Sequence, residues 1–111
     1  MKKLHVLWTS GERDVALKVV FPYLLGAKAN GWWDEINLIV WGPSALLLAG
    51  DEQLQSFLRD VADSGVSVEA CKNCTDSYKV TDKLQALQIS IRYLGAPFTE
   101  YLQGTDKVIT F

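Results

Sequence analysis

Five short apolar stretches alternate with helix-forming segments along the chain, and this alternation restricts the possible folds more than any other feature. The clearest stretch is INLIVW at residues 36–41, which is almost unbroken in its apolar character. The other expected strands are residues 4–8, 66–70, 89–94 and 107–111. A strand as apolar as INLIVW is typically buried on both faces, as in a parallel sheet that is covered by helices on either side.

The first helix is expected to follow the first strand directly and to extend to about Asn30. Thr9 and Glu12 have the spacing of a capping box, in which two side chains bond to the backbone at a helix start. Pro22 lies inside this segment and has no backbone N–H, so we expect a kink or a break near the preceding turn. Gly31 then offers the left-handed conformation that commonly ends a helix.

Further helices are expected between the later strands. Pro43 suits the first position of a helix, Thr81 is placed to cap a short one, and Gly95-Ala96-Pro97 opens the last. The segment that begins at Asp51 repeats apolar residues at the spacing of one helix face, namely Leu54, Phe57, Leu58, Val61 and Ala62. No hairpin signal such as Asn-Gly separates two strands. The sequence therefore predicts an α/β fold with a largely parallel five-stranded sheet.

The composition excludes several classes of function. A chain of 111 residues is long enough for one domain with a core, which we expect to comprise residues 1–111. The net charge of −2 and the scattered Lys and Arg residues argue against nucleic-acid binding. No apolar run approaches the roughly 20 residues needed to span a bilayer, and the N-terminus lacks a signal-peptide core. We therefore expect a cytoplasmic protein without a membrane partner, in a compartment that keeps thiols reduced.

The loops that follow the expected strands are the natural place for a ligand. In an open parallel sheet these loops gather along one edge, and ligands bind there. Several are short and contain Gly or Pro, so their backbone N–H groups could face an anion or a partner's chain. Such residues are also needed simply to turn the chain, which is the simpler explanation for any single loop. The residues that we consider for ligand binding are Ser10, Gly11, Gly42, Pro43, Ser44, Lys72 and Asn73.

Both cysteines of the chain, Cys71 and Cys74, lie in the segment EACKNCTDSY at the end of the third expected strand. Cys71 directly follows the strand, where a helix start and the adjacent Lys72 would favour a thiolate. Cys74 lies three residues further on and would share a helix face with Cys71. Buried cysteines without chemistry are common, but a pair at a strand end favours a function. We therefore predict that Cys71 is a nucleophile and that Cys74 resolves or shields it.

Three kinds of thiol chemistry are compatible with the C-x-x-C spacing. A metal site would need ligands from another subunit, because the only further ligand of the right type is His5. His5 lies in an apolar strand, where we expect a satisfied histidine rather than a catalytic one. A thioredoxin-like redox pair typically has Gly-Pro between the cysteines, where this chain has Lys-Asn. The third kind is a thiolate that accepts or passes a sulfur atom, for which we expect neither a cofactor nor a metal.

Nearly the whole chain resembles the DsrE/DsrF-like family, including its TusD-related and YchN-related branches. The resemblance rests on the opening strand and on GWWDEINLIVWGPSALLLAGDE, VSVEACKNCTDSY and YLGAPFTEYLQGTDKVITF. The segments W-G-P-S and A-C-x-x-C-x-D-S-Y look particularly like a small stand-alone branch of this family. The resemblance implies a three-layer α/β/α domain that assembles into homotrimers, hexamers or related rings.

The resemblance also implies a function in sulfur relay, with a protein that donates sulfur and another that accepts it. In the relay members a cysteine at the end of the third strand carries a persulfide, and Cys71 is the matching position. Cys74 matches a second cysteine of the YchN-like branch. Relatives commonly have Gly where this chain has Lys79, so we expect the loop to avoid a left-handed turn there. The alternatives are an oligomeric binding module with inert cysteines and, less favoured, a redox dithiol.

The aromatic content gives a second reason to expect self-association. The residues Trp8, Trp32, Trp33 and Trp41 are many for so small a core, and aromatic residues are enriched at protein interfaces. The alternative is that they fill the core of the monomer.

Overall fold

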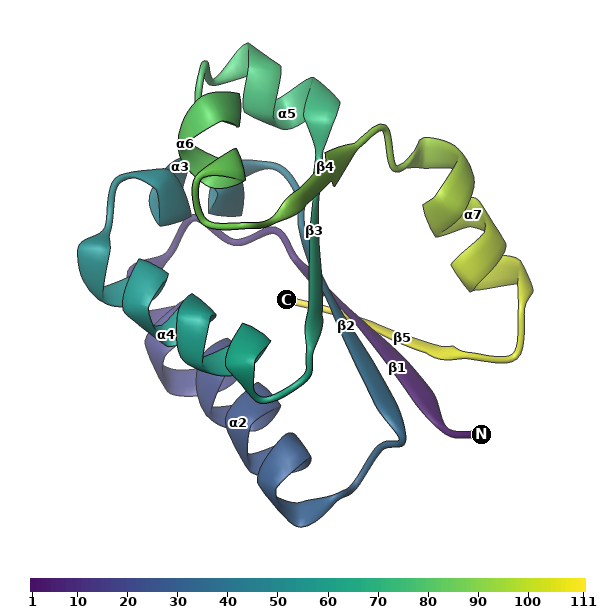
Figure 1. Ribbon diagram of the computed structural model, residues 1–111. Helices are drawn as coiled ribbons and strands as arrows, with labels where there is room; N and C mark the ends of the chain where they lie inside the picture. Colours follow the sequence, from purple (N-terminus) through teal and green to yellow (C-terminus); the bar gives the residue numbers. More distant parts are fainter.

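The computed structural model describes residues 1–111 and contains one sheet of five parallel strands in the order β4-β3-β2-β1-β5. Helices lie on both faces, so the fold is a three-layer α/β/α sandwich, as predicted (Figure 1). The strands are β1 (Lys3–Trp8), β2 (Glu35–Val40), β3 (Ser67–Cys71), β4 (Ser90–Arg92) and β5 (Lys107–Thr110).

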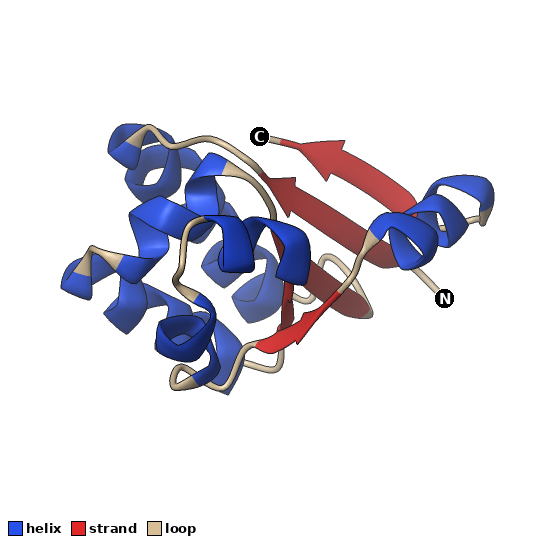
Figure 2. Ribbon diagram, turned by 90° about the horizontal axis from the view of Figure 1, so that it is seen from above, coloured by secondary structure: helices blue, strands red, loops and turns tan.

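The two faces of the sheet carry very different amounts of helix. One layer consists of α1 (Arg13–Val15), the π-helical turn η1 (Ala16–Val20), α2 (Phe21–Asn30), α3 (Pro43–Ala49), α4 (Glu52–Asp63), α5 (Lys72–Ser77) and α6 (Thr81–Gln85). The other layer is α7 (Gly95–Gln103) alone, which stands apart from the other helices in both views (Figures 1 and 2). None of these helices combines the length and the apolar character that crossing a membrane requires.

The main core lies between the sheet and the helix-rich layer. The central strand β2 contributes Ile36, Leu38 and Val40, all of them buried. Trp8 is fully buried at the end of β1, where its ring meets that of Phe21 edge-to-face with the centroids 5.4 Å apart. Of the four tryptophans, Trp8 therefore fills the core of the monomer.

The helical segment after β1 is interrupted where its proline predicts an interruption. The π-helical turn η1 directly precedes Phe21 and Pro22, which begin α2. Because proline cannot donate a backbone hydrogen bond and crowds the preceding turn, a local change of helix type accommodates it. Gly31 ends α2 in the left-handed conformation at a φ of 64°, as predicted.

Two of the expected helix caps are wrong, because the hydroxyl groups bond elsewhere. Thr9 donates to the carbonyl oxygen of Phe111 at 2.9 Å, and Glu12 makes no side-chain cap bond. Thr81 is the first residue inside α6, and its hydroxyl lies 2.5 Å from the Asp76 carboxylate. These tertiary partners replace the local backbone bonds that the capping rules assume.

Lys79 adopts the left-handed conformation, with a φ of 60°, in the turn after α5. The expectation that the loop avoids such a turn is therefore wrong. A residue with a Cβ costs about 1–2 kcal/mol in this conformation. We predict that Lys79→Gly raises the free energy of unfolding by about 0.5–1 kcal/mol, after allowing for the greater entropy of glycine in the unfolded chain.

Urea denaturation measures this change. Lys83→Gly, in the helix α6, is the matched control and should lower stability by about 1 kcal/mol, because glycine is unfavourable in helices. If Lys79→Gly destabilises the protein as much as Lys83→Gly, the left-handed turn is not a source of strain.

Candidate functional site

Cys71 and Cys74 lie together at the carboxyl edge of the sheet. Cys71 is the last residue of β3, and Cys74 lies in the first turn of α5. Both thiols are free, and Cys74 packs against the small apolar cluster that contains Cys71. Burial raises the pKa of Cys74, and although the Gly42 amide opposes this effect, the pKa stays above its ordinary value. The two cysteines therefore lie close together, and Cys74 is a weaker acid than a free thiol.

Cys71 lies on the face of the sheet that α7 covers. Only 3% of its surface is exposed, and it forms a small apolar cluster with Leu7, Ile39 and Leu94. The side chains of Trp41, Cys74, Phe98 and Tyr101 pack against this cluster. Phe98 and Tyr101 belong to α7, so this helix shields the first cysteine, whereas Cys74 is partly exposed.

The loops after β1 and β2 meet beside the cysteines, and most of their candidate residues contact the neighbouring loop or strand end. A Cβ at Gly11 would lie 3.1 Å from the Pro43 Cβ, so the two loops are in close contact. Ser44 is fully buried, and its hydroxyl donates to the Trp8 carbonyl oxygen at 2.5 Å. Gly42 has a φ of 82°, a value that L side chains rarely adopt. Gly11, Pro43 and Ser44 thus hold the strand ends in place.

The remaining sequence candidates lie on the surface. Lys72 pairs with Asp76 at 2.7 Å, and this hydrogen bond raises the pKa of Lys72. Its charge is therefore directed to a carboxylate and not to the Cys71 thiol. Asn73 is exposed on α5, and the Ser10 hydroxyl accepts a hydrogen bond from the Glu12 N–H at 3.1 Å. Of these three side chains, Asn73 is the most accessible to a ligand.

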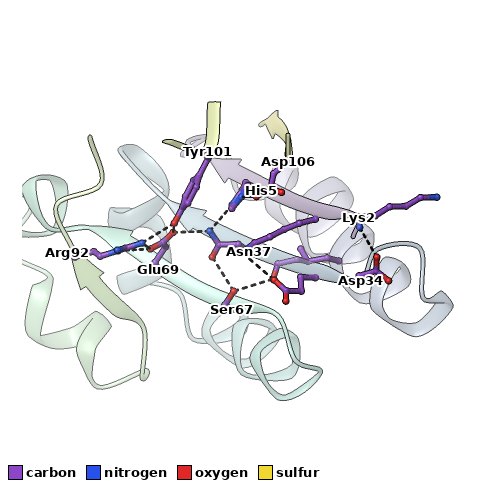
Figure 3. Close-up of polar contacts among 12 residues, drawn as sticks. Lys2, His5, Asp34, Asn37, Ser67, Glu69, Arg92, Tyr101 and Asp106 are labelled. Atoms are coloured by element: carbon purple, nitrogen blue, oxygen red, sulfur yellow. Dashed lines mark hydrogen bonds and ion pairs between the residues drawn. The ribbon is translucent and has the colours of Figure 1, made fainter. Parts of the chain in front are cut away.

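The sequence did not reveal an extended polar network on the α7 face of the sheet (Figure 3). Glu69, on β3, lies at its centre and is only 6% exposed. One carboxylate oxygen accepts from Asn37 at 2.8 Å and from Tyr101 at 2.7 Å. The other accepts from the Arg92 Nε at 2.9 Å. The network thus joins three strands to α7.

His5 extends this network to β1. Its Nδ1 lies 3.1 Å from the Asn37 amide nitrogen, whose other hydrogen is directed to Glu69. Nδ1 therefore accepts, and Nε2 carries the proton that it donates to Asp106 at 2.9 Å. The Tyr101 ring stacks on the imidazole at a centroid distance of 3.8 Å. His5 is fully buried with both nitrogens bonded, which is the satisfied histidine that the sequence predicts.

The network keeps Glu69 charged although the residue is buried. Burial raises the pKa of Glu69, but the hydrogen bonds from Asn37, Tyr101 and Arg92 together outweigh burial and bring the pKa below its usual value. The hydrogen bond to Glu69 raises the pKa of Arg92. Burial and the bond to Glu69 raise the pKa of Tyr101, so the phenol keeps its proton and can donate it.

A separate groove lies at the amino edge of the sheet, away from the cysteines. Its volume is about 470 Å³, and it is lined by Met1, Lys2, Lys3, Tyr23, Trp32, Trp33, Thr105 and Lys107. The Trp33 indole donates to the Tyr23 hydroxyl at 3.0 Å, and Trp32 is 55% exposed. Lys3 pairs with a glutamate, whereas Lys2 and Lys107 form no ion pair. The adjacent tryptophans of the GWW segment are the sequence signal for this groove.

No protein-family model and no curated protein matches the chain. Among solved structures, the conserved protein of unknown function BT1422 from Bacteroides thetaiotaomicron is 37% identical, with a TM-score of 0.96. That match covers 99% of this chain and 95% of BT1422. The ychN protein from E. coli has a TM-score of 0.70 at 20% identity, over 100% of both chains, and therefore shares the fold. The chain thus has a YchN-like fold and belongs to the family of BT1422.

Proposed function

We propose that the protein is a sulfur carrier that holds a persulfide on Cys71, with Cys74 as the resolving or shielding thiol. The observation that carries this proposal is that two free cysteines lie together at the carboxyl edge of a parallel sheet. The YchN-like fold supports it, because the resemblance of the A-C-x-x-C-x-D-S-Y loop to the DsrE/DsrF-like family implies a persulfide at this strand end.

The transfer is a pair of thiol exchange steps. In the first, the Cys71 thiolate attacks the outer sulfur of a donor persulfide, the donor S–S bond breaks, and the donor leaves as a thiolate. In the second, an acceptor thiolate attacks the outer sulfur on Cys71 and restores the Cys71 thiolate. Alternatively, the Cys74 thiolate attacks the inner sulfur, forms a Cys71–Cys74 disulfide and expels hydrosulfide. An external dithiol then reduces that disulfide.

Incubation with a small persulfide donor tests this assignment. We expect intact-protein mass spectrometry to show one added sulfur atom on the wild type and on Cys74→Ser, and none on Cys71→Ser. The raised pKa of Cys74 lowers the fraction of its reactive thiolate at neutral pH. Sulfur on Cys71→Ser would instead assign the nucleophile to Cys74, and no sulfur on any variant would reject the carrier.

The groove at the amino edge favours a second candidate, a non-catalytic module that binds a planar anion. Its volume lies in the range of small-molecule sites. Trp32 offers an exposed ring for stacking, and Lys2 and Lys107 supply positive charge, since neither side chain forms an ion pair. A titration with adenosine monophosphate should change the tryptophan fluorescence of the wild type and of Trp41→Phe, but not of Trp32→Ala. An unchanged wild-type signal would exclude this ligand class.

We also propose that the protein self-associates, as a trimer or a hexamer. Exposed apolar side chains on several elements support this proposal, namely Trp32, Leu46, Tyr93, Leu102 and Ile109. Light scattering at micromolar concentration should give three or six times the chain mass of 12.4 kDa. A mass equal to that of one chain would reject the oligomer.

A further inference from the structure

We propose that α7 is a lid over Cys71, and that Tyr101, Glu69 and Arg92 form a latch that holds it closed. The purpose of the lid rests on the proposed function, because sulfur transfer requires a donor atom to touch the Cys71 sulfur. Only 3% of Cys71 is exposed in the structure. The thiol must therefore be uncovered before it can react.

The helix α7 is both the cover and the least embedded of the longer helices. Leu94, which precedes it, is fully buried in the cluster of Cys71, and Phe98 and Tyr101 pack against that cluster. No residue within α7 is itself buried, whereas α2 and α4 each bury three or more. Both ribbon views show α7 apart from the other helices (Figures 1 and 2). Elements with few buried apolar contacts open locally at low free energy.

The two ends of α7 are suited to such an opening. Gly95 is its first residue, and Gly104 follows its last turn in an extended conformation. Residues at element ends commonly absorb the backbone changes of a closing segment. Beyond these points the chain is anchored, by the buried Leu94 on one side and by the Asp106–His5 bond on the other. The helix can therefore swing while the sheet stays intact.

Tyr101 makes the only side-chain hydrogen bonds between α7 and the sheet. Its hydroxyl donates to Glu69 at 2.7 Å and accepts from Arg92 at 3.0 Å. Figure 3 shows the phenol reaching down to the Glu69–Arg92 pair. Glu69 lies two residues before Cys71 on β3, so the latch closes beside the residue that it protects. Hydrogen bonds to charged groups are stronger than those between neutral groups.

The rate at which iodoacetamide alkylates Cys71 tests the latch. The comparison uses Cys74→Ser, which leaves Cys71 as the only thiol, with and without Tyr101→Phe. Phenylalanine keeps the ring and its stacking on His5 but loses the hydroxyl. Because the hydrogen bonds to the charged Glu69 and Arg92 are both lost, we expect alkylation to become at least about tenfold faster. Tyr93→Phe is the matched control, since its 64% exposed ring lies outside the latch, and it should leave the rate unchanged.

Hydrogen exchange distinguishes a lid from general unfolding. The amide protons of α7 should exchange faster in Tyr101→Phe, while those of α4 should not change. Equal alkylation rates in Tyr101→Phe and Tyr93→Phe would overturn the proposal, and so would an equal acceleration of exchange in α4. If Tyr101→Phe exposes Cys71 but no variant takes up sulfur, the lid stands and the carrier fails. If sulfur is taken up at the same rate with and without Tyr101→Phe, the result would support the carrier and reject the lid.

Discussion

Replacing Glu69 by glutamine is expected to lower the free energy of unfolding by about 2–3 kcal/mol at neutral pH, since hydrogen bonds to a charged acceptor are lost in a buried site. The carboxylate accepts from Asn37, Tyr101 and Arg92. A glutamine amide presents an N–H₂ group to one set of these donors. Depending on how this amide is turned, either the Arg92 guanidinium or both the Asn37 amide and the Tyr101 hydroxyl would lose their acceptor.

Comparison with the same variant should also show how Glu69 makes the stability of the wild type depend on pH. The pKa of Glu69 is lower in the folded protein than its ordinary value of 4.5, so the carboxylate stabilises the fold at all pH values above 4.5. This contribution is lost as the pH falls from 4.5 through the lower, folded value. The difference in unfolding free energy between the wild type and Glu69→Gln should thus be largest at pH 7 and should decrease as the pH falls below 4.5.

Urea denaturation across this pH range measures both effects. Glu100→Gln is the matched control, because Glu100 is exposed on α7 and makes no ion pair. It should change stability by less than about 0.5 kcal/mol. If Glu69→Gln is as stable as the wild type at pH 7, the cost of burying the carboxylate equals the stabilisation from its hydrogen bonds.

Leu38→Ala should cost about 3–4 kcal/mol of unfolding free energy, the range expected when a buried leucine is truncated and the cavity does not collapse. Leu38 is fully buried on β2, the middle strand of the sheet. Its neighbours across the sheet are Val6 on β1 and Val68 on β3. Strands on both sides hold the backbone in place, which leaves little freedom to fill the space.

Thermal or urea unfolding of Leu46→Ala provides the comparison. Leu46 lies on α3 with half of its surface exposed, so the same change in side chain should cost less than about 1 kcal/mol. Similar losses for the two variants would mean that the layer between β2 and the helices is not tightly packed.

The strands were predictable because apolar, strand-forming residues gather in five short segments, even though polar residues such as His5 and Glu69 interrupt some of them. The segment INLIVW predicted β2 and its burial on both faces, and the absence of hairpin signals predicted a largely parallel sheet. The unequal layers were not predictable in the same way. The pattern of α7 resembles that of any half-buried helix, and nothing local shows that it would cover a face of the sheet alone.

The candidate site was predictable only where its residues are close in the chain. Cys71 and Cys74 are three positions apart, so the pair was evident, but the burial of Cys71 beneath α7 was not. Glu69 and Tyr101 are 32 positions apart, and His5 and Asp106 are 101 apart. The capping prediction at Thr9 was wrong for the same reason, because the partner of its hydroxyl lies 102 positions away.

The order of the strands in the sheet also means that β1, which is made first, must wait for its neighbour β5, which is made last. β1 pairs with β5, and the ribosome delivers α7 and β5 after the other elements of the sheet. Until then one edge of β1 has no neighbour and offers a template for pairing with other chains. Contacts of such long sequence separation slow folding. Cys71 also stays uncovered until α7 has been made and has docked, so the nascent chain exposes a reactive thiol as well as an unpaired strand edge.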